Sequence, residues 1–319
     1  MIKVRVRCIE NLASDINTYE LVDVDGGVLP AFTAGAHIDV HVPGGYVRQY
    51  SLCNDPAERH RYVIGVLNVR DGRGGSSSVH HNIRAGDVLT ISEPRNHFPL
   101  SQQGQRHLLI AGGIGVTPII SMVEQLCRDN AKFMLYYCTE TPERTAFRER
   151  LAPFIELGNV VPHHDRGDPA KRLDVRGLLA EYEPGTHLYC CGPAGMTEAV
   201  RQASAHWPDG TVHFEHFQAP ASPAIDNSET QAEGEFQVRI ASSGDVFSVP
   251  TDKSILDVLR GAGMDCSSSC EAGICGTCRT RYLDGSPDHR DLILSESEQQ
   301  EYVLICCSRA NGGTLVLDL

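Results

Sequence analysis

The chain has 319 residues, of which 41% are hydrophobic and 22% charged, and its formal net charge at pH 7 is −13. This length and composition predict two or three domains of a soluble globular protein, and the acidic balance argues against nucleic acid as a partner because phosphate binding needs a basic face. No apolar run reaches the roughly 20 residues of a membrane span and the N-terminus has no signal-peptide core, so we expect a cytoplasmic protein without a membrane partner.

Residues 1–102 have the pattern of short alternating strands. HIDVHV (37–42) and YVIGVL (62–67) are two examples, and glycine-rich turns such as DGRGGS separate the segments. This pattern predicts an antiparallel barrel or sandwich.

Residues 103–218 change to an alternation of strands and helices. HLLIAGG (107–113) is typical of a buried strand, TPIISMVEQLCRD (117–129) of an amphipathic helix, and KFMLYYC (132–138) of the next strand. The alternation continues to TVHFEHF and predicts a βαβ series with a parallel sheet.

Residues 219–234 lack periodicity, are rich in Pro, Ala, Ser and acids, and predict a linker. Residues 235–319 begin with a predicted hairpin around Ser243–Gly244 and the helix SILDVLRGAG (254–263). From Asp226 onward, 16 acidic residues stand against 7 basic ones. This excess indicates either a solvated surface or a face steered toward a basic partner protein.

Four cysteines of the last region have the spacing of metal ligands. Gaps of four, two and 27 residues separate Cys270, Cys275, Cys278 and Cys306. This is the plant-type pattern of a [2Fe–2S] cluster, and Gly273 and Gly276 permit the tight backbone wrapping that it requires. Structural zinc is the competing metal, although zinc sites more usually have two C-x2-C pairs and this chain has one. Cys307 is the alternative to Cys306 as fourth ligand; we favour Cys306.

The stretch AGGIGVTP (111–118) follows a buried strand and opens a helix. Gly113 and Gly115 allow the backbone to approach a pyrophosphate, and the helix N-terminus offers free N–H groups. We expect Thr117 to cap that helix and Pro118 to occupy its first position. The pattern is not the usual dinucleotide fingerprint, but YCCGP (189–193) ends a later strand at the same sheet edge and strengthens a nucleotide site.

Two segments of the first region suit a flavin. In RQYSL, Arg48 can pair with a phosphate, Tyr50 can lie along a flat ring and Ser51 can hydrogen-bond a heteroaromatic edge. GRGGS can form a phosphate nest from Gly74, Gly75 and Ser76. A surface arginine and a plain turn are the alternative interpretations.

Several motifs occur in the order of one known family: RQYSLCND, GRGGSSS, PRNHFPL, AGGIGVTPIISM, YCCGP, GTVHFEHF, SSCEAGICGTC, DHRDLILSE and CCSRANGGTLVLDL. Together they closely resemble the phthalate dioxygenase reductase family, which includes the vanillate demethylase reductase subunits, over essentially the whole chain. The resemblance implies a multidomain fold. Its parts are an antiparallel FMN-binding β-barrel (1–102), an α/β NAD-binding domain with a parallel sheet (103–218) and a C-terminal α+β, ferredoxin-like β-grasp domain (235–319).

The resemblance also implies the residues of each site. Those expected to hold FMN are Arg48, Gln49, Tyr50, Ser51, Gly74, Gly75, Ser76, Thr117 and Phe217. Those expected at NAD are Gly113, Gly115, Cys191, Gly192 and Pro193. Gln49 stands where the family commonly has Thr, which leaves the role of its side chain open. Cys307 stands where other members often have Val, which supports Cys306 as the ligand.

The implied activity is electron transfer from NADH to a separate Rieske-type non-haem iron oxygenase, by a chain expected to be a monomer. NADH gives a hydride and a [2Fe–2S] cluster accepts single electrons, so the flavin must stand between them. Ser51, Thr117 and Cys191 are the expected catalytic residues, acting as orienting groups. We expect the linker to let the ferredoxin domain move between its own flavin and the oxygenase.

Other functions remain to be compared. A Rieske oxygenase is excluded for this chain, because no cysteine is followed two positions later by histidine. A self-sufficient NADH diaphorase and a non-enzymatic electron-transfer or zinc module stay open. We expect NADH rather than NADPH, because TETPERT (139–145) places Glu140 and Glu143 beside Arg144 instead of the basic cluster that a 2′-phosphate needs.

Overall fold

The computed structural model describes residues 1–70, 72, 74–217, 234–268, 270–291 and 293–319. The chain divides into a first unit, Met1–Phe217, and a second unit, Gln218–Leu319. Of the predicted linker 219–234, all but Gly234 lies outside the described residues. In the described ranges, no helix is long and apolar enough to cross a membrane.

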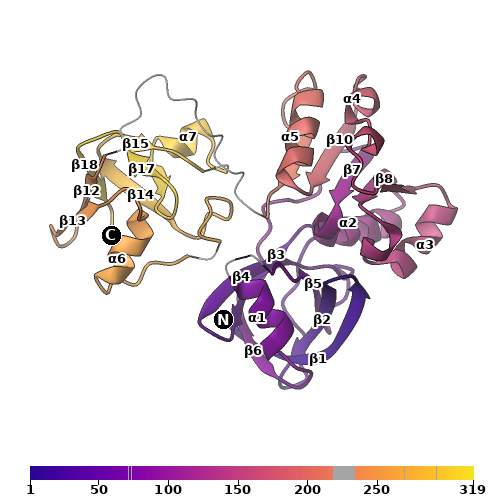
Figure 1. Cartoon of the computed structure of the whole chain (residues 1–319), viewed down its shortest axis with the longest axis horizontal. Helices are drawn as coiled ribbons and strands as arrows, with labels where there is room; N and C mark the ends of the chain where they lie inside the picture. The colour runs from indigo at the N-terminus through magenta and orange to yellow at the C-terminus, as the bar shows by residue number, and fades with distance from the viewer. Residues whose placement is uncertain (71, 73, 218–233, 269, 292) are drawn as a thin grey trace. The chain divides into compact units, whose positions relative to one another are not determined.

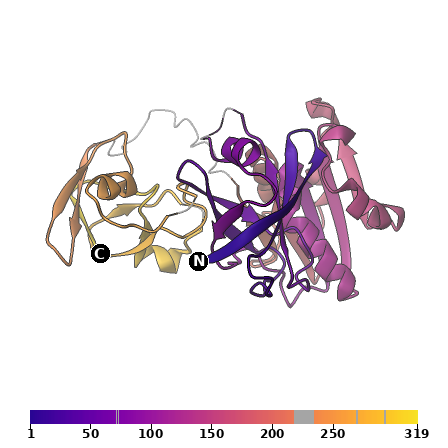
Figure 2. The same cartoon turned by 90° about the horizontal axis from the view of Figure 1, so that it is seen from below.

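The first unit begins with a six-stranded antiparallel sheet of order β4-β3-β6-β1-β2-β5. An isolated bridge between Leu52, directly after β4, and Ile64 of β5 joins the two edge strands, so the sheet closes on itself around one apolar core. The indigo β1 and β2 form a long curved ribbon (Figure 1 and Figure 2). The elements are β1 Ile2–Ala13, β2 Ile16–Asp23, β3 His37–Val42, β4 Tyr46–Ser51, β5 Tyr62–Leu67, α1 Gly75–Asn82 and β6 Val88–Ile91.

A five-stranded parallel sheet of order β11-β10-β7-β8-β9 completes the first unit. The strands are β7 Arg106–Gly112, β8 Lys132–Thr139, β9 Val160–His164, β10 Thr186–Cys191 and β11 Val212–Glu215. The α-helices are α2 Val116–Arg128, α3 Arg148–Glu156, α4 Val175–Leu178 and α5 Ala194–Ala203, with 3-10 turns at η1 Gly113–Gly115, η2 Pro142–Arg144 and η3 Pro169–Lys171.

Both faces of this parallel sheet are covered, as its continuous apolar strands predict. Along β10, Tyr189 and Cys191 enter the core shared with α2 and α3, whereas Leu188 and Cys190 enter the core beneath α4 and α5. Because β7 and β10 pair in parallel, with Cys191 opposite Ala111, their carboxyl ends lie at the same edge of the sheet.

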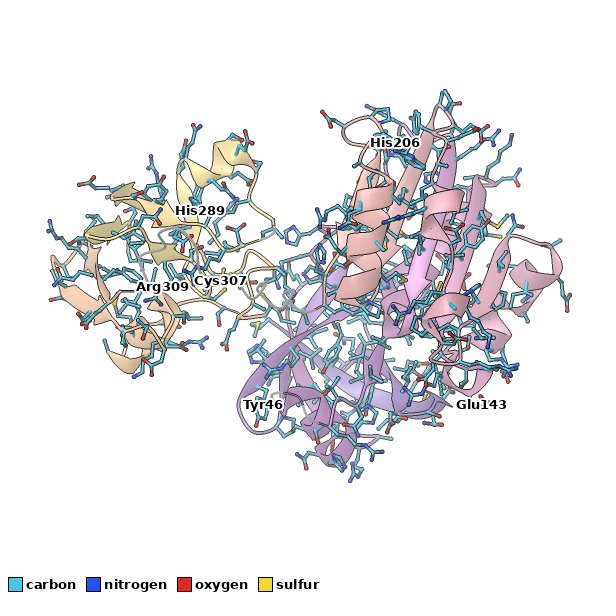
Figure 3. All side chains as sticks on the ribbon, turned by 45° about the horizontal axis from the view of Figure 1, so that its top comes forward. Tyr46, Glu143, His206, His289, Cys307 and Arg309 are labelled. Atoms are coloured by element: carbon cyan, nitrogen blue, oxygen red, sulfur yellow. The ribbon has the colours of Figure 1, made fainter. Side chains whose placement is uncertain are left out.

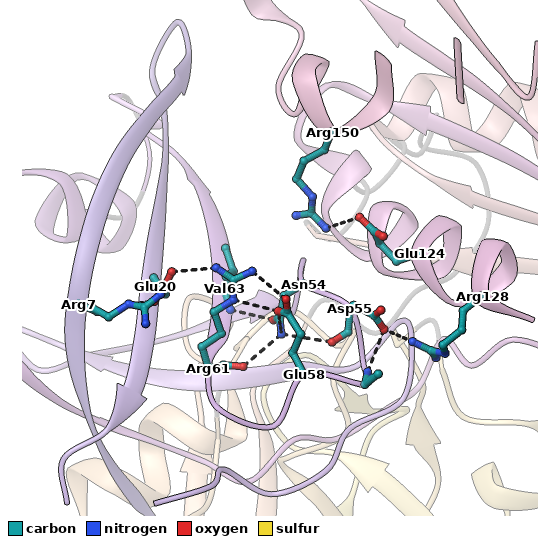
Figure 4. A network of polar contacts seen from close by, with 11 residues as sticks. Arg7, Glu20, Asn54, Asp55, Glu58, Arg61, Val63, Glu124, Arg128 and Arg150 are labelled. Carbon is teal, nitrogen blue, oxygen red and sulfur yellow. Dashed lines mark hydrogen bonds and ion pairs between the residues drawn. The ribbon is translucent and has the colours of Figure 1, made fainter. Parts of the chain in front are cut away.

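The barrel and the parallel sheet share the core of the first unit. Ala13, Ile16 and Cys53 of the barrel are buried in the same cluster as α2 and β8. Asp55, in the loop before β5, also forms an ion pair with Arg128 at the end of α2 (Figure 4). This shared core gives the candidate flavin and nucleotide segments a common rigid support.

The second unit contains a five-stranded mixed sheet of order β13-β12-β18-β14-β16, in which β12 and β18 are parallel. The predicted hairpin is confirmed by the antiparallel pair β12–β13, and the predicted helix by α6, which a Ser254–Asp257 capping box starts. The elements are β12 Phe236–Ile240, β13 Val246–Val249, α6 Ile255–Gly261, β14 Arg279–Asp284, β15 Pro287–Asp288, α7 Glu296–Gln299, β16 Tyr302–Leu304, β17 Arg309–Ala310 and β18 Thr314–Leu317.

Candidate functional site

Arg48 of β4 lies across the start of α1. A Cβ on Gly75 would stand 2.3 Å from Arg48 Nε, and a Cβ on Gly74 would stand 2.9 Å from the Tyr46 hydroxyl. The Arg48 guanidinium lies 5.2 Å from the centre of the Tyr46 ring. Gly74 has a φ of 81°, so both space and backbone conformation require glycine here. The result is a cation beside the start of a helix, where the first backbone N–H groups have no carbonyl of the same helix to bind, and this is the chemistry of a phosphate site.

Two buried polar atoms of the barrel lack a partner among the described residues. They are the amide Nε2 of Gln49 on β4 and the amide Oδ1 of Asn68, directly after β5. One is a donor and the other an acceptor, and buried groups of this kind normally find partners. Ser76, by contrast, already accepts a hydrogen bond from Val69 N at 3.2 Å. The segment therefore fits a ligand such as FMN, which carries a phosphate and a ring edge of mixed donors and acceptors.

Tyr50 and Ser51 complete β4. Tyr50 packs partly buried against the barrel core, and this burial raises the pKa of its hydroxyl. Ser51 is buried at the carboxyl end of the strand, where it pairs with His37 of β3.

The glycine turn after β7 contacts the turn after β10 backbone to backbone. A Cβ on Gly115 would stand 2.2 Å from the Cys191 carbonyl oxygen, and one on Gly192 would stand 3.1 Å from Gly112 Cα. A Cβ on Gly112 would stand 2.7 Å from Pro193 Cδ. Gly113 has a φ of 52°. The structure thus brings together the segments predicted for NAD: Gly113, Gly115, Cys191, Gly192 and Pro193.

The expected capping role of Thr117 is wrong. Helix α2 begins at Val116, because the 3-10 turn Gly113–Gly115 runs directly into it. Thr117 is consequently the second helical residue and Pro118 the third. The Thr117 hydroxyl donates to the Ile114 carbonyl at 2.9 Å, and its methyl faces Gly65 of the barrel.

Glu215 is a residue of this edge that sequence reasoning did not select. It ends β11 in register with Cys191, and burial raises the pKa of its carboxyl to about 8. Burial, followed by the charge of Glu215, raises the pKa of the Cys191 thiol, which is therefore neutral near pH 7. The only signal in the sequence was an acidic residue at the end of an apolar strand. Phe217, two residues further on, is 40% exposed.

The cysteine loop of the second unit gathers three thiols. The Cys270 thiol lies within hydrogen-bonding reach of those of Cys275 and Cys306, and the backbone N–H of Ala272 points at Cys270 Sγ from 3.4 Å. Cys278 is buried directly before β14, and its carbonyl accepts from Ile305 N next to Cys306. Four thiols with backbone N–H groups aimed at sulfur suit an iron–sulfur cluster. The φ angles of 72° at Gly273 and 70° at Gly276 confirm that the loop needs glycine.

The Cys307 thiol lies in contact with that of Cys306. The Cys307 thiol donates to the Leu304 carbonyl at 3.7 Å, and a Cβ on Gly273 would stand 2.7 Å from its sulfur. Cys307 therefore lies beside Cys306, with Gly273 and the Leu304 carbonyl as its other neighbours.

At the carboxyl end of β8, Glu140 forms an ion pair of 3.4 Å with Arg144. The backbone N–H of Arg166 donates to the Glu140 carbonyl at 2.8 Å, which ties the ends of β8 and β9 together. The local charge of this edge is therefore balanced rather than strongly basic.

Comparison with known proteins gives the following similarities. The family described as "Oxidoreductase NAD-binding domain" matches residues 109–202, and "2Fe-2S iron-sulfur cluster binding domain" matches residues 238–311. The chain is 44% identical to phthalate dioxygenase reductase of Burkholderia cepacia, covering 100% of this chain and 97% of that protein. It is 48% identical to vanillate O-demethylase oxidoreductase of Pseudomonas putida, covering 96% of each. The solved structure titled phthalate dioxygenase reductase superposes with a TM-score of 0.78 at 44% identity, covering 100% of this chain and 98% of that one.

Proposed function

The chain belongs to the phthalate dioxygenase reductase family, and from that premise we propose that it is the monomeric, NADH-dependent reductase of a Rieske-type non-haem iron oxygenase. It is an oxidoreductase with FMN, NADH and a [2Fe–2S] cluster as its cofactors, and its relatives are reductase subunits of oxygenases. The Rieske type of the partner, the monomeric state and the site residues are the proposed parts.

The contact between Thr117 and Gly65 is the observation that carries the site assignment. Through this contact, the start of α2, which directly follows the glycine turn after β7, packs against the barrel strand β5 within one shared core. FMN, when bound, can take up a hydride and release its electrons singly. Ser51, Thr117 and Cys191 are each at most 4% exposed, so they exclude water from the junction and hold their groups in one orientation.

We assign FMN binding to residues of β4 and the start of α1. Arg48 and the N–H groups of Gly75 and Ser76 would bind its phosphate, as charge-assisted hydrogen bonds favour. The Gln49 Nε2, buried without a partner among the described residues, supports a role for this side chain at the flavin ring. Tyr50, Ser51 and Thr117 would line the ring, with Phe217 beside them.

We assign the nicotinamide half of NADH to the glycine turn after β7 and to the Cys191–Pro193 turn. The neutral thiol of Cys191 acts there by packing and not as a nucleophile. At the carboxyl end of β8, the negative charge of the Glu140 carboxylate would repel the 2′-phosphate of NADPH, and this favours NADH. We assign the cluster to Cys270, Cys275, Cys278 and Cys306.

The protein with twelve cysteines is proposed to work in the cytoplasm, where thiols stay reduced. The test of function mixes the purified full chain anaerobically with NADH or NADPH and follows flavin and cluster absorbance. NADH should bleach both at low concentration, and NADPH should do so far more slowly. Dioxygen-dependent turnover should then require a Rieske oxygenase. Full NADH oxidation with small acceptors alone and none with any oxygenase would favour a diaphorase. Sedimentation should give one chain per particle.

A further inference from the structure

The segment DHRD (288–291) begins at the last residue of β15 and has no role in the sites above. Within it, the side chain of Asp291 is completely buried. Its Oδ1 accepts from the backbone N–H groups of Ile293 at 3.1 Å and Leu294 at 2.8 Å. Its Oδ2 is buried and has no hydrogen-bond partner in the described part of the chain. One oxygen of this carboxylate therefore stabilises the local turn, and the other oxygen is available to accept a further hydrogen bond.

The candidate donor to Asp291 Oδ2 is Nδ1 of His289. It lies 3.8 Å from Asp291 Oδ2, and it is itself buried without a partner among the described residues. A donor and an acceptor, each otherwise unsatisfied, thus face each other slightly beyond hydrogen-bond distance. A small movement of the ring closes the bond and satisfies both atoms. Figure 3 shows His289 and Cys307 in the second unit.

Asp291 also packs against the cysteine loop. A Cβ on Gly273 would stand 3.2 Å from Asp291 Cα and 3.5 Å from the Arg290 carbonyl oxygen. Gly273 lies between Cys270 and Cys275, so the DHRD segment supports the loop from outside. The buried carboxylate of Asp291 therefore belongs to a segment packed directly against the loop that carries Cys270 and Cys275.

We propose that His289 and Asp291 form a positioning pair, in which the buried carboxylate supports the cysteine loop and lowers the reduction potential of the cluster, while His289 holds and partly offsets that carboxylate. This inference rests on the proposed cluster in the loop. Reduction adds an electron to the cluster, and a nearby buried negative charge opposes that step.

The test is the reduction potential of the cluster in the full-length holoprotein, measured by redox titration with EPR detection. Asp291→Asn keeps an oxygen to accept from Ile293 and Leu294 but removes the charge, so its cluster potential should be more positive than that of the wild type. Asp288→Asn is the matched control, because it removes the same charge from the same segment where Asp288 pairs with Arg290 at the surface. It should leave the potential unchanged, and the FMN potential should not move in either variant.

His289 provides an independent test. His289→Ala should shift the cluster potential in the negative direction, because the carboxylate loses its donor. Loss of the cluster's visible absorbance to a chelator should become roughly tenfold faster, the size expected for a lost hydrogen bond to a charged group. His289→Asn, whose amide can take the place of Nδ1, should restore both values.

The proposal is overturned if Asp291→Asn and Asp288→Asn shift the potential equally, or if His289→Ala matches the wild type in both potential and cluster loss. If the Asp291→Asn protein fails to assemble a cluster, its potential cannot be measured, and the comparison of His289→Ala with the wild type decides. A wild-type protein without [2Fe–2S] signals would instead contradict the proposed function itself.

Discussion

Gly65 of β5 and Thr117 of α2 are packed so closely that a methyl group on Gly65 would stand 2.8 Å from Thr117 Cγ2. The Thr117 hydroxyl is bound to the Ile114 carbonyl, so the side chain cannot rotate away without breaking that bond. The absence of a side chain at residue 65 therefore sets how closely the nucleotide turn approaches the barrel.

Replacing Gly65 by Ala should separate these two surfaces. We expect the free energy of unfolding of the first unit to fall by about 1–3 kcal/mol, as for overpacked cores, and flavin reduction by NADH to slow. Trp207, the single tryptophan, reports unfolding of this unit in urea. Gly195→Ala is the control, because nothing lies within 4 Å of a Cβ there; an equal loss in both variants would refute the contact's importance.

Arg48 should matter for retention of FMN. Arg48→Gln removes the cation beside the start of α1, and we expect FMN affinity to fall by roughly tenfold to a hundredfold, the size of one or two charge-assisted hydrogen bonds. Titration of the apoprotein with FMN, followed by flavin fluorescence, measures this. Arg84→Gln removes the same charge just after the other end of α1 and should bind FMN normally.

The choice between Cys306 and Cys307 can be tested directly. Cys306→Ser should lose most of the visible absorbance and iron of the cluster, because Cys306 lies among the other thiols. Cys307→Val should keep a full cluster, because its sulfur points to the Leu304 carbonyl. Iron and sulfide analysis of both proteins decides, and the reverse result would make Cys307 the ligand.

His37 should make the first unit sensitive to acid. Burial, aided by Arg95 and His97, lowers the pKa of His37 from 6.5 to about 4. At pH values between these two pKa values, His37 is protonated in the unfolded chain and neutral in the folded chain. The free energy of unfolding therefore falls as pH falls through this range. From pH 7 to 5 the loss from this group should be about 2 kcal/mol. His37→Leu should remove that part of the pH dependence in urea titrations; an unchanged slope would contradict it.

Glu215 should act with the opposite sign. Its pKa of about 8 in the folded chain, raised by burial, means that the folded protein keeps a proton which the unfolded chain releases above about 4.5. Its contribution to stability is therefore present at low pH and is lost as pH rises through 8. Glu215→Gln cannot ionise, so its stability relative to the wild type should increase from pH 6 to pH 9. A constant difference would show that Glu215 is already ionised.

Local features of the sequence predicted the elements and most of the chemistry. The period-two pattern of 37–42 and 62–67 is that of β3 and β5, and the strand–helix alternation after residue 103 is that of the parallel sheet. The spacing of Cys270, Cys275 and Cys278 predicted a cluster loop, because its ligands come from one short stretch of chain. Capping by Thr117 failed because a 3-10 turn, which has no clear sequence signal, started the helix earlier.

What the sequence alone determined was which chemical groups the protein carries and in which segments, because propensity, periodicity and ligand spacing act over a few residues. The tertiary structure decided which distant groups meet: Gly65 with Thr117, Cys191 with Glu215, and Asp291 with the loop at Gly273. These contacts depend on strand register and on close packing between elements far apart in the chain, where fractions of an ångström matter. For the same reason the contacts of Cys307 with Cys306, Gly273 and the Leu304 carbonyl could be read only from the folded chain.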